Sequence, residues 1–356
     1  MNGIFTISLD FELHWGGFEK WQLAQSSQSP VGGRQAPVTG RRQRTSLNEY
    51  FLSTRQAIPR MLELFEKHGG HVTWASVGLL LNDSKEELLR NAPSNTPSYK
   101  NQKLSAYHFV DTHGIGQNEQ GDPFHFAPSL VRQILKTPHQ ELGTHSYAHF
   151  YCNEPGQTVE QFREDLKAAK KVSEKYGVKV RSMVFPRNQF NDAYLEVCIQ
   201  EGITSVRSNP LDWFWNIQST QNEPAWKRLN RGLDAYFPIG KKNTYKLSDI
   251  PVRSDIPVCL PASRLLRPYR PTEWLLNDFK INRIKSEMIR AARNSEVYHL
   301  WWHPHNFGHY PEQSLLGLEK ILSYYNRCRD QYGMISLNMG ETCDLIHQLH
   351  GKNQAA

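Results

Sequence analysis

Four apolar runs in this chain each lead into side chains that can bind a metal ion or transfer a proton. Each run is typical of a buried strand, so each polar group would lie at a strand's carboxyl end. In parallel α/β folds the loops converge at that end of the sheet, and functional sites are built there. The polar residues are Asp10 and Glu12 in ISLDFELHWG, His145 and His149 in ELGTHSYAH, Arg187 in SMVFPRNQF, and His303 in YHLWWHPHN. Their combined chemistry indicates a metal-dependent hydrolase.

Apolar strand-like runs alternate with amphipathic helices, which predicts a mostly parallel α/β domain. Thr158 and Gln161 fit a capping box at the start of one helix, and Asp192 is the expected cap of another. We predict strands at Ile4–Leu9, Val72–Ser76, Glu141–Thr144, Ser182–Phe185, Thr204–Val206, Pro257–Leu260, Val297–Trp302 and Met334–Ser336. We predict helices at Ala57–Lys67, Val159–Tyr176, Ala193–Gln200 and Glu312–Arg329.

Residues 1–350 are expected to form a single domain, with residues 351–356 as a tail. Segments 20–47 and 92–127 interrupt the strand–helix pattern and are interpreted as loop insertions, while 208–255 is irregular and rich in aromatic residues. Long loops in compact domains often serve as lids or binding loops.

Composition narrows the class of protein. The 356 residues are 38% hydrophobic with a net charge of +7, and one α/β barrel can accommodate this length. The five cysteines never form a CxxC pair, which favours reduced thiols, and the basic residues form only short groups, which argues against a nucleic-acid partner. The chain has no long apolar stretch, and MNGIFTISLDFE lacks the basic region of a signal peptide. We therefore expect a cytoplasmic protein without a membrane span.

The histidine pair His145 and His149 is the first candidate for metal binding. On a helical turn, imidazoles four residues apart face the same way and can share one ion at about 2.0–2.1 Å each. Two solvent-facing loop histidines are the alternative interpretation. The chain has three such pairs, and only the first follows a strand ending in Gly-Thr: His145/His149, His299/His303 and His305/His309.

Asp10 and Glu12 would share one face of a strand, with Phe11 pointing into the core. Two neighbouring carboxylates repel each other unless a positive charge lies between them. A divalent cation would supply that charge, with one carboxylate as ligand and the other as general base. Salt bridges to arginine are the alternative.

The stretch HLWWHPHNF ends a predicted strand at His303, because Pro304 cannot extend the ladder. We favour His303 as the acid–base histidine. His305 is the alternative, either as the active residue or as a core histidine bonded to the backbone.

Six motifs occur in an order that resembles the polysaccharide deacetylase family, also called NodB-homology or carbohydrate esterase family 4. They are ISLDFE, HGGHVTWASVG, HQELGTHSYAH, VFPRN, LDWFW and LWWHP, and they extend from Phe5 to about His303. The resemblance implies a distorted (β/α)7-8 barrel that removes acetyl groups from sugars. It also implies one divalent metal ion, with zinc as the first candidate and cobalt, manganese or nickel as alternatives.

The resemblance assigns His145 and His149 as metal ligands and Asp10 as the base. The family's first motif usually has adjacent aspartates, the second being a ligand. Here Phe11 takes that place, so Glu12 is the expected third ligand.

The same resemblance makes His303 the general acid, oriented by Asp212, and Arg187 the residue that keeps Asp10 ionised. The family's arginine normally precedes the proline of the third motif, whereas Arg187 follows Pro186.

The resulting hypothesis is a hydrolase of carbon–nitrogen bonds other than peptide bonds, acting on an acetylated sugar of a glycan or glycan precursor, N-acetyl rather than O-acetyl. A backbone N–H near Asn188 would bind the oxyanion, and Trp15 and Trp213 would stack on the sugar, with His305 also contacting the substrate. The alternatives are an allantoinase-like cyclic-amide hydrolase, a glycoside hydrolase with two carboxylates, and an inactive glycan-binding protein.

Overall fold

The computed structural model describes residues 2–23, 46–210, 226, 234 and 243–354. Within these residues, the strands form one nine-stranded parallel sheet in the order β6-β5-β4-β3-β2-β1-β8-β7, and β9 also pairs with β1. The strands are β1 (Ile4–Phe11), β2 (Val72–Ser76), β3 (Gln140–Thr144), β4 (Ser182–Met183), β5 (Ser205–Ser208), β6 (Val258–Pro261), β7 (Arg264–Leu265), β8 (Val297–Trp302) and β9 (Ile335–Ser336).

Every predicted strand is present, and β2 and β8 have the predicted bounds. The first strand, β1, runs on to Phe11, because its pairing with β2 continues as far as Ser76. The two-residue strand β7 was not predicted, since so short a segment has no periodicity to detect. All residues of β1, β2 and β8 are buried, as expected for parallel strands covered on both faces.

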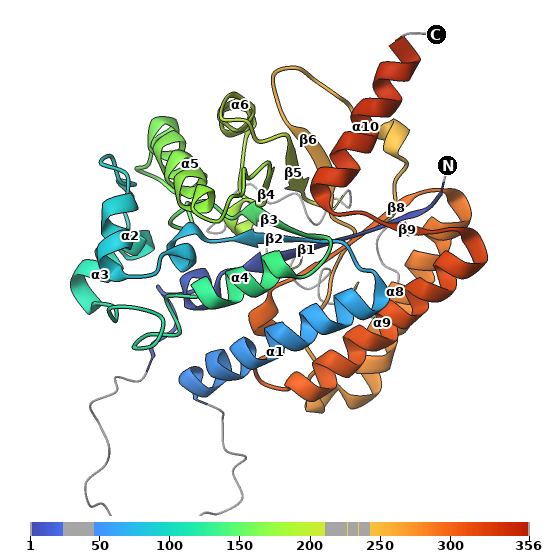
Figure 1. The fold of residues 1–356 in the computed structure, drawn as a ribbon, viewed down its shortest axis with the longest axis horizontal. Coiled ribbons are helices and arrows are strands. Elements are labelled where there is room, and N and C mark those ends of the chain that lie inside the picture. Colours follow the sequence, from blue (N-terminus) through green and yellow to red (C-terminus); the bar gives the residue numbers. More distant parts are fainter. Residues whose placement is uncertain (1, 24–45, 211–225, 227–233, 235–242, 355–356) are drawn as a thin grey trace, which may run out of the picture.

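Helices lie outside the curled sheet, with α1, α8 and α9 together on one side of it (Figure 1). The helices are α1 (Leu47–His68), α2 (Lys85–Asn91), α3 (Ala106–His113), α4 (Pro128–Lys136), α5 (Val159–Glu174), α6 (Asp192–Gln200), α8 (Trp274–Asn294), α9 (Pro311–Tyr332) and α10 (Met339–Gln354). Short 3-10 helices lie at Leu13–Gly16 (η1), Gly78–Leu81 (η2), Gln102–Leu104 (η3), Pro186–Asn188 (η4), Leu247–Asp249 (η6), Pro271–Glu273 (η7) and Pro304–Phe307 (η8).

The starts of α5, α1 and α6 show how far capping residues in the sequence predict where a helix begins. The predicted capping box of Thr158 and Gln161 begins α5, so this prediction is confirmed. Helix α1 begins ten residues before the predicted Ala57, at a capping box of Ser46 and Glu49 that the polar composition of the preceding segment obscured. Helix α6 is capped by Asn191, whose side chain accepts from the N–H of Ala193, and not by Asp192.

The segment 92–127 is more ordered than the predicted loop insertion. It contains η3 and α3, and its end packs against the loop that follows β1. The indole Nε1 of Trp15 donates to the carbonyl of His125 at 3.0 Å, and Nδ1 of His14 is 2.8 Å from Nε2 of His125. This segment therefore supports the carboxyl end of β1. Of the predicted irregular segment 208–255, the described part from residue 243 contains η6.

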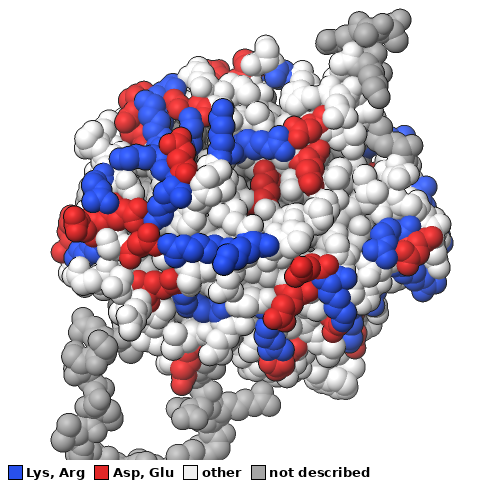
Figure 2. Space-filling model, in the orientation of Figure 1, with Lys and Arg blue, Asp and Glu red and all other residues white. Residues whose placement is uncertain are grey.

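The surface carries charges of both signs close together. Lys and Arg side chains alternate with Asp and Glu across the face shown in Figure 2. None of the described helices is both long enough and apolar enough to cross a membrane.

Candidate metal centre and acid–base site

The carboxyl ends of β1, β3 and β8 meet at one edge of the sheet, and each leads directly into a candidate residue. Strand β2 lies between β1 and β3, with Phe11 paired to Ser76 and Ser76 paired to Thr144. The residues after these pairs are Glu12 and His145, so the parallel register itself brings them to the same edge. Strand β8 pairs with the other side of β1 and ends one residue before His303.

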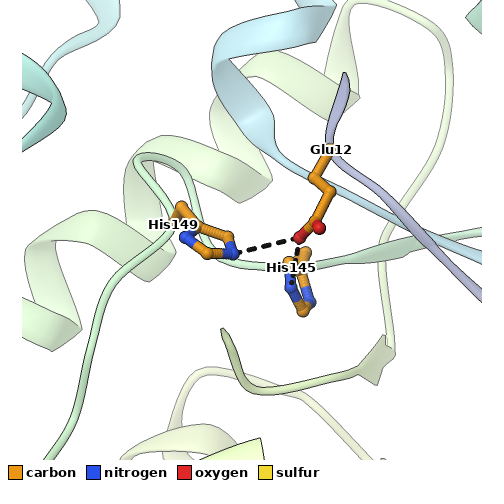
Figure 3. Close-up of side chains that lie close together, drawn as sticks. All are labelled: Glu12, His145 and His149. Carbon is orange, nitrogen blue, oxygen red and sulfur yellow. Dashed lines mark hydrogen bonds and ion pairs between the residues drawn. The ribbon is translucent and has the colours of Figure 1, made fainter. Parts of the chain in front are cut away.

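Glu12, His145 and His149 converge on one point (Figure 3). The Glu12 Oε2 atom lies 3.3 Å from Nε2 of His145 and 3.0 Å from Nε2 of His149. One donor atom from each residue lies within 4.8 Å of the others, and all three side chains are buried. The structure therefore brings together the three residues that the sequence predicted as metal ligands.

Local backbone geometry directs the Glu12 carboxylate. Glu12 was predicted to share a strand face with Asp10, but it lies just outside β1. It is the residue at the N-terminal cap of η1, with φ −132° and ψ −17°. A Cβ atom at Gly16 would lie only 2.1 Å from Oε1 of Glu12. Glycine at position 16 is therefore required for this carboxylate to fold back towards the histidines.

The loop that carries the histidine pair is not the predicted helical turn. Ser146 and His149 have left-handed φ values of 62° and 56°, and the segment is bent. Asp165 of α5 holds this loop, because its buried carboxylate accepts the backbone N–H groups of Tyr147 at 2.8 Å and Ala148 at 3.0 Å. Burial raises the pKa of Asp165 to about 7, although the two backbone hydrogen bonds oppose that shift.

The hydrogen bonds behind the histidines fix which nitrogen faces the centre. Nδ1 of His145 lies 2.8 Å from the carbonyl of Val184, and a carbonyl only accepts, so this nitrogen carries the proton. Nδ1 of His149 lies 3.0 Å from the hydroxyl of Tyr151. Partners of this kind orient metal-bound imidazoles in many proteins. They leave Nε2 of each ring directed at Glu12.

The charges at this point fit a divalent cation better than protons. Burial lowers the pKa of His149, which disfavours an imidazolium there. Although burial alone raises the pKa of Glu12, the neighbouring His303, His145 and His149 hold it well below its usual range. An ionised carboxylate thus faces two imidazole nitrogens, and two histidines with one carboxylate are a known zinc ligand set.

Asp10 is paired with a residue that the sequence prediction missed. Arg207 on β5 donates from Nη1 to Oδ1 at 2.6 Å and from Nη2 to Oδ2 at 2.8 Å, and neither side chain is more than 5% exposed. Burial raises the pKa of Asp10, but Arg207 and the nearby histidines lower it overall. The guanidinium also stacks on the Trp301 ring at 4.2 Å. Asp10 is therefore held as a carboxylate.

The prediction that Arg187 holds Asp10 is wrong. Arg187 has a left-handed φ of 55° inside η4, and its side chain points to Glu19 at 2.5 Å and Glu154 at 3.2 Å. Its guanidinium lies 4.0 Å from the ring of Tyr151, the residue that contacts His149. Arg187 therefore supports the histidine loop and not the base. The position of Arg207, a charged residue near the end of a strand, was the signal in the sequence that could have identified it as the partner of Asp10.

The His303 imidazole lies beside both carboxylates, with Nε2 at 3.6 Å from Oδ2 of Asp10 and 3.5 Å from Oε1 of Glu12. Its side chain is 27% exposed, against 5% for either carboxylate, so the site opens on the side of His303. His305 is buried, and burial together with the nearby His303 charge lowers its pKa to about 3. It therefore stays neutral and is a poor alternative acid.

The remaining predicted site residues have mixed outcomes. Trp15 is fully buried against His125, so its ring is not available for stacking on a sugar. The backbone N–H of Asn188 already donates to the carbonyl of Phe185 at 2.9 Å, which contradicts its expected role towards an oxyanion. Asp212 and Trp213 lie outside the described residues.

The curled parallel sheet with this cluster at its carboxyl edge is a distorted (β/α) barrel of the NodB-homology type. Residues 52–206 match the sequence model of the family described as polysaccharide deacetylase, the family that the motifs resemble. The matched segment contains His145 and His149 but neither Asp10 nor Glu12.

Solved structures with the same fold share little sequence with this chain. A protein from Mycobacterium smegmatis assigned as a polysaccharide deacetylase is 12% identical with a TM-score of 0.57, and the match covers 98% of this chain and 91% of that one. A protein from Pseudomonas aeruginosa PAO1 with the same assignment is 12% identical with a TM-score of 0.54 and the same coverage. No curated protein sequence matches the chain.

Proposed function

We propose that this protein is a metal-dependent deacetylase that hydrolyses an acetyl group from a sugar of a glycan or glycan precursor. The observation that carries the proposal is the Glu12 carboxylate lying between two imidazole nitrogens at 3.3 and 3.0 Å. The match of residues 52–206 to the polysaccharide deacetylase family supports an acetylated glycan as substrate. Zinc is the first candidate for the ion, although nitrogen and oxygen ligands would also accept cobalt, manganese or nickel.

The ion would be held by Glu12, His145 and His149. When bound there, it would supply the positive charge that polarises the acetyl carbonyl and eases the loss of a proton from water. Three protein ligands leave a catalytic zinc site open to water and substrate. The partly exposed His303 marks the side from which a substrate would enter.

Asp10 would act as the general base, because Arg207 keeps it ionised at the edge of the cluster. The water oxygen would bond to the acetyl carbon while its proton passes to the Asp10 carboxylate. As the carbon–nitrogen bond breaks, His303 would protonate the leaving nitrogen, giving acetate and a free amine. An amine leaves only with a proton, so removal of an N-acetyl group requires an acid at this position.

Acetate release from N-acetylhexosamine oligosaccharides tests this function. The wild-type protein, purified without chelator, should release acetate and expose amines, and Asp10→Asn should reduce that rate by about 10²–10⁴-fold. Asp111→Asn, an exposed aspartate on α3, serves as the matched control and should keep full activity. Undiminished hydrolysis by Asp10→Asn would exclude Asp10 as the base, and released sugar in place of acetate would indicate a glycoside hydrolase.

A further inference from the structure

A second histidine–carboxylate cluster lies at the opposite ends of the same strands. His71 directly precedes β2, His139 directly precedes β3, and Glu341 lies in the first turn of α10. Because Val72 pairs with Gln140 in parallel register, the residues before them are neighbours across the sheet. Their imidazole rings stack with centroids 4.0 Å apart and an angle of 6° between the planes.

The carboxylate of Glu341 faces this histidine pair. Its Oε2 lies 2.6 Å from Nδ1 of His71 and also accepts the N–H of Asn338 at 2.9 Å. Burial raises the pKa of Glu341, but the hydrogen bonds from His71 and Asn338 and the charges of both histidines hold it below the usual value. The carboxylate therefore stays ionised beside two imidazoles.

Ordinary helix capping accounts for only part of this arrangement. Asn338 and Glu341 form a reciprocal capping box at the start of α10, and His71 adds one hydrogen bond to it. The imidazole of His139 has no part in the cap, yet a left-handed φ of 63° places it face to face with His71. That backbone conformation is strained for a residue other than glycine.

We propose that His71, His139 and Glu341 form a second binding site for a divalent transition-metal ion of the zinc type. One donor atom from each residue lies within 4.8 Å of the others. Donors bound to zinc at about 2.0–2.1 Å in a tetrahedron are about 3.4 Å apart, so the site closes when the two stacked rings tilt until the lone pairs of both imidazoles point at one ion. His139 is exposed and His71 and Glu341 are half-buried, which gives an ion access from solution and leaves a position for water.

The ion would fasten α10 to the sheet. Helix α10 begins against β2 and β3, where Met339 N–H donates to Oγ1 of Thr73 at 2.9 Å and Gly340 N–H donates to Glu141 at 3.1 Å. This second site lies at the amino ends of β2 and β3, whereas Glu12, His145 and His149 lie at the carboxyl edge of the sheet. Its role is therefore structural, and it does not depend on the proposed function.

Zinc stoichiometry tests this site without any measurement of activity. Equilibrium dialysis should show that His139→Ala binds one equivalent of zinc fewer than His347→Ala. His347 is an exposed histidine on α10, so its replacement serves as the control. The same loss should occur in a His145→Ala, His149→Ala background, which lacks the first cluster. Equal zinc binding by the His139→Ala and His347→Ala proteins would overturn the proposal.

Thermal unfolding gives an independent readout in the same background. Zinc at about 100-fold above its Kd should raise the Tm by a few degrees, because binding to the native state alone stabilises it. Adding His139→Ala should abolish that rise, and His347→Ala should not. A rise that survives His139→Ala would place the bound ion elsewhere and contradict the proposed ligands.

Discussion

Replacing Arg207 by methionine removes the guanidinium that holds Asp10 while keeping much of the side-chain volume. The pair is joined by two hydrogen bonds, at 2.6 and 2.8 Å, and both side chains are buried. A hydrogen bond to a charged group contributes about 1.5–3 kcal/mol, and breaking a buried ion pair costs about 3–5 kcal/mol. We therefore expect the free energy of unfolding at pH 7 to fall by about 3–5 kcal/mol.

The loss should depend on pH in a defined direction. In the wild type the pKa of Asp10 is lowered, so its contribution to stability is present above the ordinary carboxyl pKa and is lost as pH falls through the lowered value. In the variant, burial is no longer opposed by Arg207, so the pKa of Asp10 rises and its ionised form destabilises the fold at neutral pH. The difference between the two proteins should therefore shrink from pH 7 towards about pH 4.

Urea unfolding, followed by tryptophan fluorescence, measures this effect. Asp10→Asn in the Arg207→Met protein should recover much of the lost stability, because no buried carboxylate then lacks a partner. Arg187→Met is the matched control, since that arginine pairs with Glu19 and Glu154 and should show no coupling to Asp10→Asn. An unchanged unfolding midpoint for Arg207→Met, or equal coupling for both arginines, would refute this reasoning.

Three further changes act on other parts of the site. Glu12→Gln should weaken zinc binding by at least about 10-fold in equilibrium dialysis, because it removes a charged ligand. His303→Gln should lower the rate of acetate release by about 10²–10⁴-fold without reducing zinc content. Because the pKa of Asp165 is raised to about 7, its protonation stabilises the native state at low pH, and that stability is lost as pH rises from about 4 to 7. Asp165→Asn should flatten this part of the Tm–pH curve measured by calorimetry.

For each of these three predictions, a defined result would contradict it. Full zinc affinity in Glu12→Gln would exclude that carboxylate as a ligand, and full acetate release by His303→Gln would exclude that histidine as the acid. An unchanged Tm–pH curve in Asp165→Asn would mean that the Asp165 carboxyl does not titrate with the proposed shift.

Strand positions could be predicted because they depend on local sequence. The runs Val72–Ser76 and Val297–Trp302 are mostly apolar and are buried throughout, as is typical of parallel strands covered on both faces. The strand ends predicted from such runs also predicted the shared edge at which Glu12, His145 and His149 meet. The candidate metal ligands were therefore accessible from sequence, because Glu12 and His145 directly follow strands and His149 lies in the loop after β3.

The partner of Asp10 could not be predicted in this way. Arg207 lies 197 residues from Asp10 in sequence and reaches it only through the curvature of the sheet. The family motif suggested Arg187 instead, but the left-handed backbone at that position turns its side chain towards Glu19. The burial of Trp15 was hidden for a similar reason, since it depends on His125 in a segment that looked like a loop.

Anomalous diffraction at the zinc edge, from crystals grown with one equivalent of zinc, would locate the metal ion itself. We predict the strongest peak at about 2.0–2.2 Å from a carboxylate oxygen of Glu12 and from Nε2 of His145 and His149. A peak at this position would show that Glu12, directly after β1, and two histidines of the loop after β3 bind one ion. Zinc bound elsewhere, with these three side chains unchanged and in direct contact, would contradict the proposed metal centre.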